Sequence, residues 1–287
     1  MQIITVTALV IFSALMIGVG LYSARKTKTM DAFLLGNRNI GAWMSAFAYG
    51  TSYFSAVIFI GYAGKHGWDI GVAAMWIGIG NAILGCLIAW LVLAKRTRNM
   101  THSLNVKTMP EYFEARYGSK NLKILSAIII FVFLVPYSAA VYKGLGSLFN
   151  TIFPSISVNV CMLMVAALTA CFLVLGGYIA STYTDFIQGI IMIGGVILMV
   201  VIVALNPSVG GIPNMIERLR DVEPSLVHIF GGDKFTFLAW NILLTSFGTW
   251  GLPQMISKFY AVKDESAIKR ATVVSTVFAG IIGVGAY

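Results

Sequence analysis

The sequence predicts an all-α protein that crosses a membrane many times. Of its 287 residues, 58% are hydrophobic and only 11% are charged, whereas a soluble domain carries about 25% charged residues. The apolar residues also come in runs of about 20, the length of helix that crosses the roughly 30 Å core of a bilayer. Because only helices and closed barrels satisfy backbone polar groups in lipid, and these runs are too long for barrel strands, we expect transmembrane helices.

We expect eight spans, of which the last is incomplete. They cover residues 3–22, 41–63, 70–94, 124–149, 157–176, 179–205, 235–257 and 270–287. Turn and charge signals separate them, at residues 36–38, 65–67, 95–98, 154–155 and 176–177. The pair Gly176-Gly177 leaves no room for a connecting segment, so the two spans beside it are expected to form a tight hairpin.

The distribution of basic residues predicts the orientation of the chain in a cell membrane. If the N-terminus lies outside, the inside segments hold most of the Lys and Arg residues, among them Lys95, Lys120 and Lys258. Cytoplasmic loops of membrane proteins carry such an excess. The first span lacks the basic start of a signal peptide and is followed by Arg25 and Lys26, so we interpret it as a retained helix.

Composition and motif content argue against several other functions. The net charge of +9 comes from short clusters between apolar runs rather than from one basic face, which argues against a nucleic-acid partner. The three cysteines lie inside apolar spans and the three histidines are scattered, so we expect neither a disulfide framework nor a site for a transition metal. The sequence contains no nucleophile elbow, phosphate loop or His/Glu metal pattern, so no enzyme is indicated.

Two spans carry glycine and hydroxyl residues in the middle of the membrane. Residues 47–56 read FAYGTSYFSA, and residues 245–254 read TSFGTWGLPQ. An interrupted helix frees backbone carbonyls that bind a hard cation, and such breaks in two corresponding helices mark a site at the membrane midplane. We therefore expect the chain to unwind around residues 50–55. Small residues also allow close helix packing, and this alternative stays open.

Asp185 lies in the inner part of the sixth span, where residues 181–188 read STYTDFIQ. An acid inside a membrane helix costs about 3 kcal/mol or more unless it faces water or a partner, so we interpret Asp185 as a residue of an ion pathway. The alternative is an interfacial acid that meets water or a cytoplasmic lysine. Gln188 follows one turn later and is expected to extend a polar stripe on the same side.

Three segments resemble the sodium:solute symporter family. They are DAFLLGNRNIG at residues 31–41, YTDFIQ at residues 183–188, and GLPQ at residues 251–254 with FYAVKD at residues 259–264. The resemblance implies a leucine-transporter-like fold of two inverted five-helix repeats. Residues 41–205 would form the first repeat, residues 235–287 would start the second, and residues 3–22 would be an extra helix. We expect a single transporter domain that is truncated at Tyr287.

The resemblance also implies a function and a set of site residues. Family members couple inward sodium flow to the uptake of a small organic solute, with sodium as the coupling ion. The backbone carbonyls of Thr51 and Phe54 would bind sodium, Ser52 would line the broken segment, and Asp185 would lie on the inner exit route. Because a helix beyond Tyr287 would complete this site, residues 1–287 alone are not expected to transport. Residues near the substrate or its gate would be Tyr53, Ser55, Trp250, Gly251 and Gln254.

The chain departs from the family pattern at three positions. The branch that carries proline has an Asp where this chain has Tyr53, which counts against proline. Leu252 and Gln254 replace the common Gln and His, so sugars, amino acids, vitamins and monocarboxylates all stay open as solutes. The alternative functions are a membrane sensor, in which a signalling domain follows the same fold, and a structural module without transport.

Overall fold

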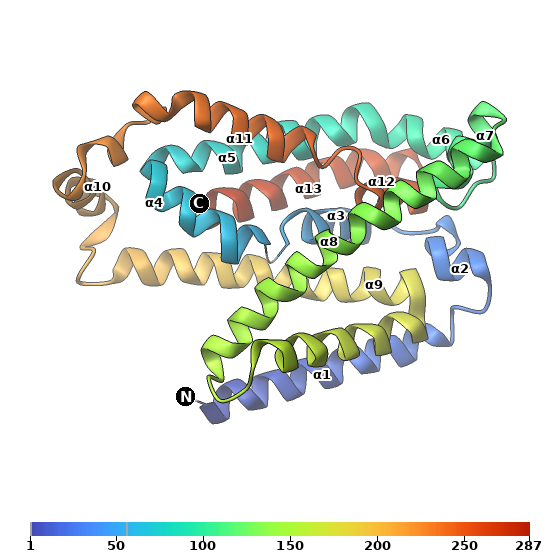
Figure 1. Ribbon diagram of the computed structural model, residues 1–287, viewed down its shortest axis with the longest axis horizontal. Helices are drawn as coiled ribbons and strands as arrows, with labels where there is room; N and C mark the ends of the chain where they lie inside the picture. Colours follow the sequence, from blue (N-terminus) through green and yellow to red (C-terminus); the bar gives the residue numbers. More distant parts are fainter. Residues whose placement is uncertain (1, 56) are drawn as a thin grey trace.

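The computed structural model describes residues 2–55 and 57–287, and every named element in this part of the chain is helical. The long helices α1, α9, α11 and α13 run roughly along the long axis of the molecule, and α8 crosses them at an angle (Figure 1). Five helical stretches of the described residues are long and apolar enough to cross a membrane. They are Thr5–Ala24, Ala63–Ser103, Lys120–Ile152, Val158–Leu205 and Glu265–Ala286.

The first half of the chain contains α1 (Gln2–Ala24), α2 (Met30–Leu35), η1 (Gly36–Arg38), α3 (Ala42–Tyr53), η2 (Val57–Tyr62), α4 (Ala63–Ile70), η3 (Gly71–Ala74), α5 (Met75–Gly80), η4 (Asn81–Ile88), η5 (Trp90–Ala94), α6 (Lys95–Ser103), α7 (Met109–Tyr117) and α8 (Lys120–Ile152). Of these, η2, η4 and η5 are π-helical, and η1 and η3 are 3₁₀ turns. The second half contains α9 (Val158–Leu205), α10 (Gly211–Val222), η6 (Pro224–Val227), η7 (Gly232–Lys234), α11 (Phe235–Phe247), α12 (Pro253–Ala261) and α13 (Glu265–Ala286).

These helices correspond to the eight predicted spans. The two arms of α9 are the fifth and sixth spans, while α3 with η2 and α11 with α12 are the second and seventh. No half of either interrupted span reaches the 18 residues of a single crossing helix. The two interruptions, together with the joining of the fifth and sixth spans in one helical stretch, explain why five stretches rather than eight meet the length criterion.

The hairpin inside α9 turns at Gly177, as predicted. Gly177 has φ 53° and ψ −144°, a conformation that residues with a Cβ rarely adopt. A Cβ at this position would lie 2.6 Å from the Phe33 ring and 2.8 Å from the Phe33 carbonyl oxygen. Figure 1 shows the chain doubling back there, so that one arm lies beside α1 and the other faces the interior of the bundle.

Two of the turns predicted from the sequence are not turns in the structure. Residues 65–67 and 95–98 are helical, within α4 and α6. Lys65 and Lys95 are exposed, and a long charged side chain on a helix surface does not end the helix. The chain turns instead at Gly71, which has φ 58° and ψ −136° and packs against the backbone of Leu226.

The core lies where α13 contacts α3, the second arm of α9 and η4. Glycines allow the close approach: a Cβ on Gly50 would overlap the Phe278 ring, and a Cβ on Gly283 would lie 2.9 Å from the Gly78 Cα. Small residues at such contacts are typical of membrane helices, which gain little from the hydrophobic effect and associate through close packing.

The segments predicted to lie inside the cell all gather at one end of the bundle, which we call the basic end. Arg38 donates to the Val106 carbonyl at 2.6 Å, and Arg98 donates to the Val262 carbonyl at 2.9 Å. Lys107 pairs with Asp31 at 3.0 Å. These contacts join α2, η1, α6, the loop before α7 and the turn before α13 (Figure 1). The topology is thus consistent with the charge pattern, while the direction through the membrane stays a prediction.

The N-terminus of α13 is fixed at the basic end by its cap. The Asp264 carboxylate accepts hydrogen bonds from the Ala267 N–H at 2.7 Å and from the Ser266 hydroxyl at 2.8 Å. These bonds stabilise the charged carboxylate and hold the pKa of Asp264 below its usual value.

Replacing Gly177 by alanine should destabilise the protein by about 1–3 kcal/mol, because the new Cβ makes this conformation strained and meets Phe33. The measurement is the melting temperature of the purified protein in detergent. The matched control is Gly194→Ala on the second arm of α9, where a Cβ meets nothing within 4 Å. A Gly177→Ala variant as stable as this control would contradict the role assigned to the turn.

Candidate functional site

The first interruption begins at Phe54, later than predicted. Residues 50–53 are helical, and the Phe54 N–H still donates to the Gly50 carbonyl at 2.9 Å. Phe54 then leaves the helix with φ −90° and ψ 72°, Ser55 is not helical, and Ala56 lies outside the described residues. Both interpretations of the small residues therefore apply, at different positions: Gly50 serves helix packing, and the chain opens at residues 54–55.

The interruption ends the regular backbone hydrogen bonding of α3. The Ile58 N–H donates to the Ser55 carbonyl at 3.0 Å. Among the described residues, no backbone N–H outside the helices donates to the carbonyl of Thr51 or Phe54. Phe54 is only 2% exposed, so its carbonyl lies in a protected part of the molecule. Unpaired carbonyl oxygens in such a place can bind a cation.

The second interruption separates α11 from α12 and lies beside the first. Residues 248–252 form a turn in which the Leu252 N–H donates to the Thr249 carbonyl at 3.2 Å, and α12 begins at Pro253. The Tyr53 hydroxyl donates to the Thr245 carbonyl at 2.9 Å. This hydrogen bond joins two segments that are 192 residues apart in the sequence.

A cluster of neutral polar groups surrounds this connection. The Asn81 side-chain oxygen accepts hydrogen bonds from the hydroxyls of Thr245 at 2.8 Å and Ser246 at 3.1 Å. Asn81 is fully buried, and its amide nitrogen has no hydrogen-bond partner among the described residues. Gly85, one turn along η4, makes room for the Tyr53 hydroxyl. We did not predict Asn81, although it is the one strongly polar residue in the apolar run of residues 70–94.

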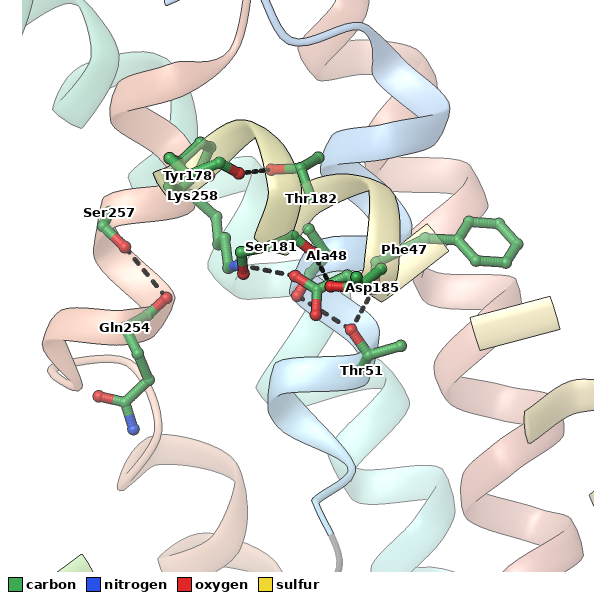
Figure 2. A network of polar contacts seen from close by, with 11 residues as sticks. Phe47, Ala48, Thr51, Tyr178, Ser181, Thr182, Asp185, Gln254, Ser257 and Lys258 are labelled. Carbon is green, nitrogen blue, oxygen red and sulfur yellow. Dashed lines mark hydrogen bonds and ion pairs between the residues drawn. The ribbon is translucent and has the colours of Figure 1, made fainter. Parts of the chain in front are cut away.

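A buried ion pair lies on the other side of the first interruption. The Lys258 ammonium on α12 is 3.0 Å from an Asp185 carboxylate oxygen on the second arm of α9. Their side chains are only 7% and 16% exposed. Figure 2 shows Lys258 reaching toward Asp185, with the hydroxyls of Thr51 and Ser181 beside the carboxylate. The ammonium also lies 5.3 Å from the centre of the Tyr178 ring.

The partner of Asp185 was not predicted from the sequence. We expected either an ion pathway or an interfacial acid that meets water or a cytoplasmic lysine, and the structure pairs Asp185 with Lys258, a buried lysine that we had placed in a cytoplasmic segment. Lys258 was counted as a loop charge because the predicted span ended at residue 257, whereas α12 continues to Ala261. The apolar residues on both sides of Lys258 in the sequence were the signal that the helix continues past this lysine.

The remaining predicted residues lie in separate surroundings. Trp250 donates from its ring nitrogen to the Leu84 carbonyl at 3.1 Å, and Gly251 lines an apolar cavity of about 650 Å³ along α8. The Gln254 amide is enclosed without a partner among the described residues and points away from Asp185 (Figure 2). Gln188 contacts Met16 on α1 at 3.8 Å. Ser52 and Ser55 are half-buried.

Two interrupted helices that meet at their breaks, within a bundle of apolar helices, define a polytopic membrane protein with the leucine-transporter-like fold. A solved Na⁺-coupled sialic acid symporter, in a substrate-bound outward-open state, shares this fold with a TM-score of 0.76. The match covers 97% of this chain and 59% of that chain at 17% sequence identity. The predicted fold class is confirmed.

The chain belongs to the sodium:solute symporter family, whose sequence model matches residues 33–287. It is 29% identical over 301 residues to the osmoregulated proline transporter OpuE of Bacillus subtilis. It is 30% identical over 275 residues to sodium/proline symporter 2 of Staphylococcus saprophyticus. These matches cover 99% and 93% of this chain, but 59% and 52% of the relatives. The chain therefore spans a little more than half the length of these relatives.

A double-mutant cycle should show strong coupling between Asp185 and Lys258. Either Asp185→Asn or Lys258→Met leaves one charge buried without its partner and should cost about 3–5 kcal/mol. The double variant should be more stable than the sum of the two losses predicts, because no unpaired charge remains. Melting temperatures in detergent measure the effect.

The control is the exposed pair Lys95–Glu265, whose side chains are 60% and 47% exposed. Lys95→Met should leave the melting temperature nearly unchanged, because exposed ion pairs contribute little. Additive losses at Asp185 and Lys258 would show that the two charges do not stabilise each other.

Proposed function

We propose that this chain works in a sodium-coupled secondary active symporter, which carries a small organic solute across a membrane by alternating access. Membership in the sodium:solute symporter family supports this function. The observation that carries the proposal is the interruption at Phe54 in the protected centre of an apolar bundle, where no backbone N–H of the described residues outside the helices donates to the carbonyl of Thr51 or Phe54. Transporters typically form their ion sites from such interrupted helices, whose unwound backbone carbonyls coordinate sodium.

Sodium binds, in this proposal, to the carbonyls of Thr51 and Phe54. Carbonyl dipoles replace the water around a small hard cation, and the nearby Ser52 adds a hydroxyl. Asp185 is the acidic side chain beside this carbonyl site, because the Thr51 hydroxyl lies next to its carboxylate. Asp185 lies about two helical turns from the Gly177 hairpin at the basic end. An ion that leaves the carbonyls toward this end therefore passes Asp185.

The solute binds between the two interruptions. The polar groups that line this region are neutral: the Tyr53 hydroxyl, the unpartnered Asn81 amide and the indole of Trp250. Ser55, Gly251 and Gln254 are assigned to the path by which the solute enters or leaves. The named relatives are proline transporters, so proline is the first solute to test. Tyr53 counts against proline, because the proline-carrying branch of the family has an Asp at this position.

We assign the protein to a cell membrane, with its N-terminus outside the cell. The gathering of Arg38, Arg98 and Lys107 at one end of the bundle supports this orientation, because cytoplasmic loops are rich in basic residues. Residues 41–205 are assigned to the first repeat and residues 235–287 to the second.

The full-length protein, reconstituted in vesicles, should take up its solute faster with an inward sodium gradient than with an equal choline gradient. The panel contains proline, sugars, vitamins and monocarboxylates. Asp185→Asn should raise the sodium concentration for half-maximal uptake by about tenfold, the equivalent of one lost interaction of ~1.4 kcal/mol.

Uptake at equal rates in sodium and choline would contradict symport. An unchanged sodium dependence in Asp185→Asn would remove Asp185 from the ion path. Solute binding without any uptake would favour the alternative, a membrane sensor built on the same fold.

Tyr53→Phe should raise the solute concentration for half-maximal uptake by about fivefold, because it removes a hydrogen bond of ~1 kcal/mol between the interruptions. The matched control is Tyr117→Phe on α7, where the ring is 65% exposed. Equal uptake parameters for both variants would show that the Tyr53 hydroxyl is not needed for the solute site.

A further inference from the structure

Asp185 and Lys258 are isolated from all other charges on their helices. Residues 158–205 of α9 contain a single charged residue, Asp185, and residues 253–261 of α12 contain a single charged residue, Lys258. Helix α3, which packs against both, contains none. Each of the two groups is therefore the one counter-charge available to the other on these three helices.

Oxygen atoms surround the Asp185 carboxylate on the side of α3 and α9. The hydroxyls of Thr51 and Ser181 lie beside it, and the Thr51 hydroxyl donates to the Phe47 carbonyl at 2.9 Å (Figure 2). A carboxylate with hydroxyl neighbours suits a small hard cation, since such ions prefer oxygen ligands. In this structure the position next to the carboxylate holds the Lys258 ammonium, 3.0 Å away.

We propose that the Lys258 ammonium is the resident cation of the Asp185 carboxylate, and that sodium reaches these oxygens only by replacing it. An ammonium and a sodium ion both carry one positive charge, so either neutralises Asp185, and a second cation beside the first would be repelled by it. The proposal rests on the proposed function, which supplies the sodium. It adds that Lys258 competes with sodium for the Asp185 carboxylate on the exit route.

The surroundings of the ammonium support this competition. Lys258 has a flexible stem with the charge on one terminal atom, so it can withdraw from Asp185 without disturbing the helix. The Tyr178 ring at 5.3 Å offers it a second, weaker contact. Withdrawal of Lys258 would leave a buried carboxylate that needs another cation, because an uncompensated buried charge is strongly unfavourable.

Lys258→Met makes the competition measurable with sodium alone. The purified full-length protein is melted in detergent across a sodium titration, with choline holding the ionic strength constant. Lys258→Met should gain a sodium-dependent rise in melting temperature of about 3 °C over that of the wild type, because sodium now stabilises the folded state through Asp185. Lys258→Arg keeps the charge and should respond as the wild type does.

Two further variants separate this effect from the carbonyl site. Asp185→Asn/Lys258→Met retains the carbonyls of Thr51 and Phe54 but lacks the carboxylate, so it should lose the added sodium response. Lys95→Met removes a lysine at an exposed pair and should leave the response unchanged. Lys258→Gln repeats the main experiment with a different neutral side chain. Uptake is not measured here, so failure of the proposed symport would not hide the result.

An added sodium response in Lys258→Met or Lys258→Gln that disappears in the double variant supports the proposal. Three outcomes would overturn it. The neutral variants respond to sodium no more than the wild type, they are stabilised by acid instead of sodium, or they remain unfolded in sodium as in choline. In each of these cases sodium does not take the place of the ammonium.

Discussion

A backbone carbonyl without a hydrogen-bond donor survives inside a membrane only where protein covers it, and this constraint organises the centre of the molecule. The chain leaves the helix at Phe54, and the rings of Tyr53 and Phe278 pack around this residue with centroids 5.0 and 6.5 Å from the Phe54 ring. The helices around the break approach closely because Gly50 and Gly85 have no side chains. Close helix packing therefore covers the interrupted backbone and shields its polar groups from lipid.

Much of the fold could be predicted because membrane helices leave clear signals in a sequence. Apolar runs of about 20 residues located the spans, and the pair Gly176-Gly177 located the hairpin, since few other residues accept the conformation found at Gly177. Charge was a poorer guide to helix ends. Lys65 and Lys95 lie within helices, because their side chains extend from the surface and do not disturb the backbone.

The site was harder to predict, because its residues act in pairs that come from distant segments. Asp185 stood out as an acid in an apolar run, but its partner Lys258 lies 73 positions away, at a predicted boundary. Asn81 lies 164 positions from Thr245, and only the packing of η4 against α11 brings them together. Thr51 was selected for its carbonyl, whereas the structure also places its hydroxyl beside Asp185. Pairing of this kind depends on the three-dimensional arrangement.

The contact between Gly78 and Gly283 has a mechanical consequence. At this point the two helices meet backbone to backbone, and a Cβ on Gly283 would lie 2.9 Å from the Gly78 Cα. Side chains that interdigitate hold two helices at one relative height, because each must leave its groove before the helices can slide. The glycine contact acts in the same way, because a shift of α13 along α5 would bring the Cβ of a neighbouring residue against the opposite backbone, where even a Cβ at Gly78 or Gly283 has no room.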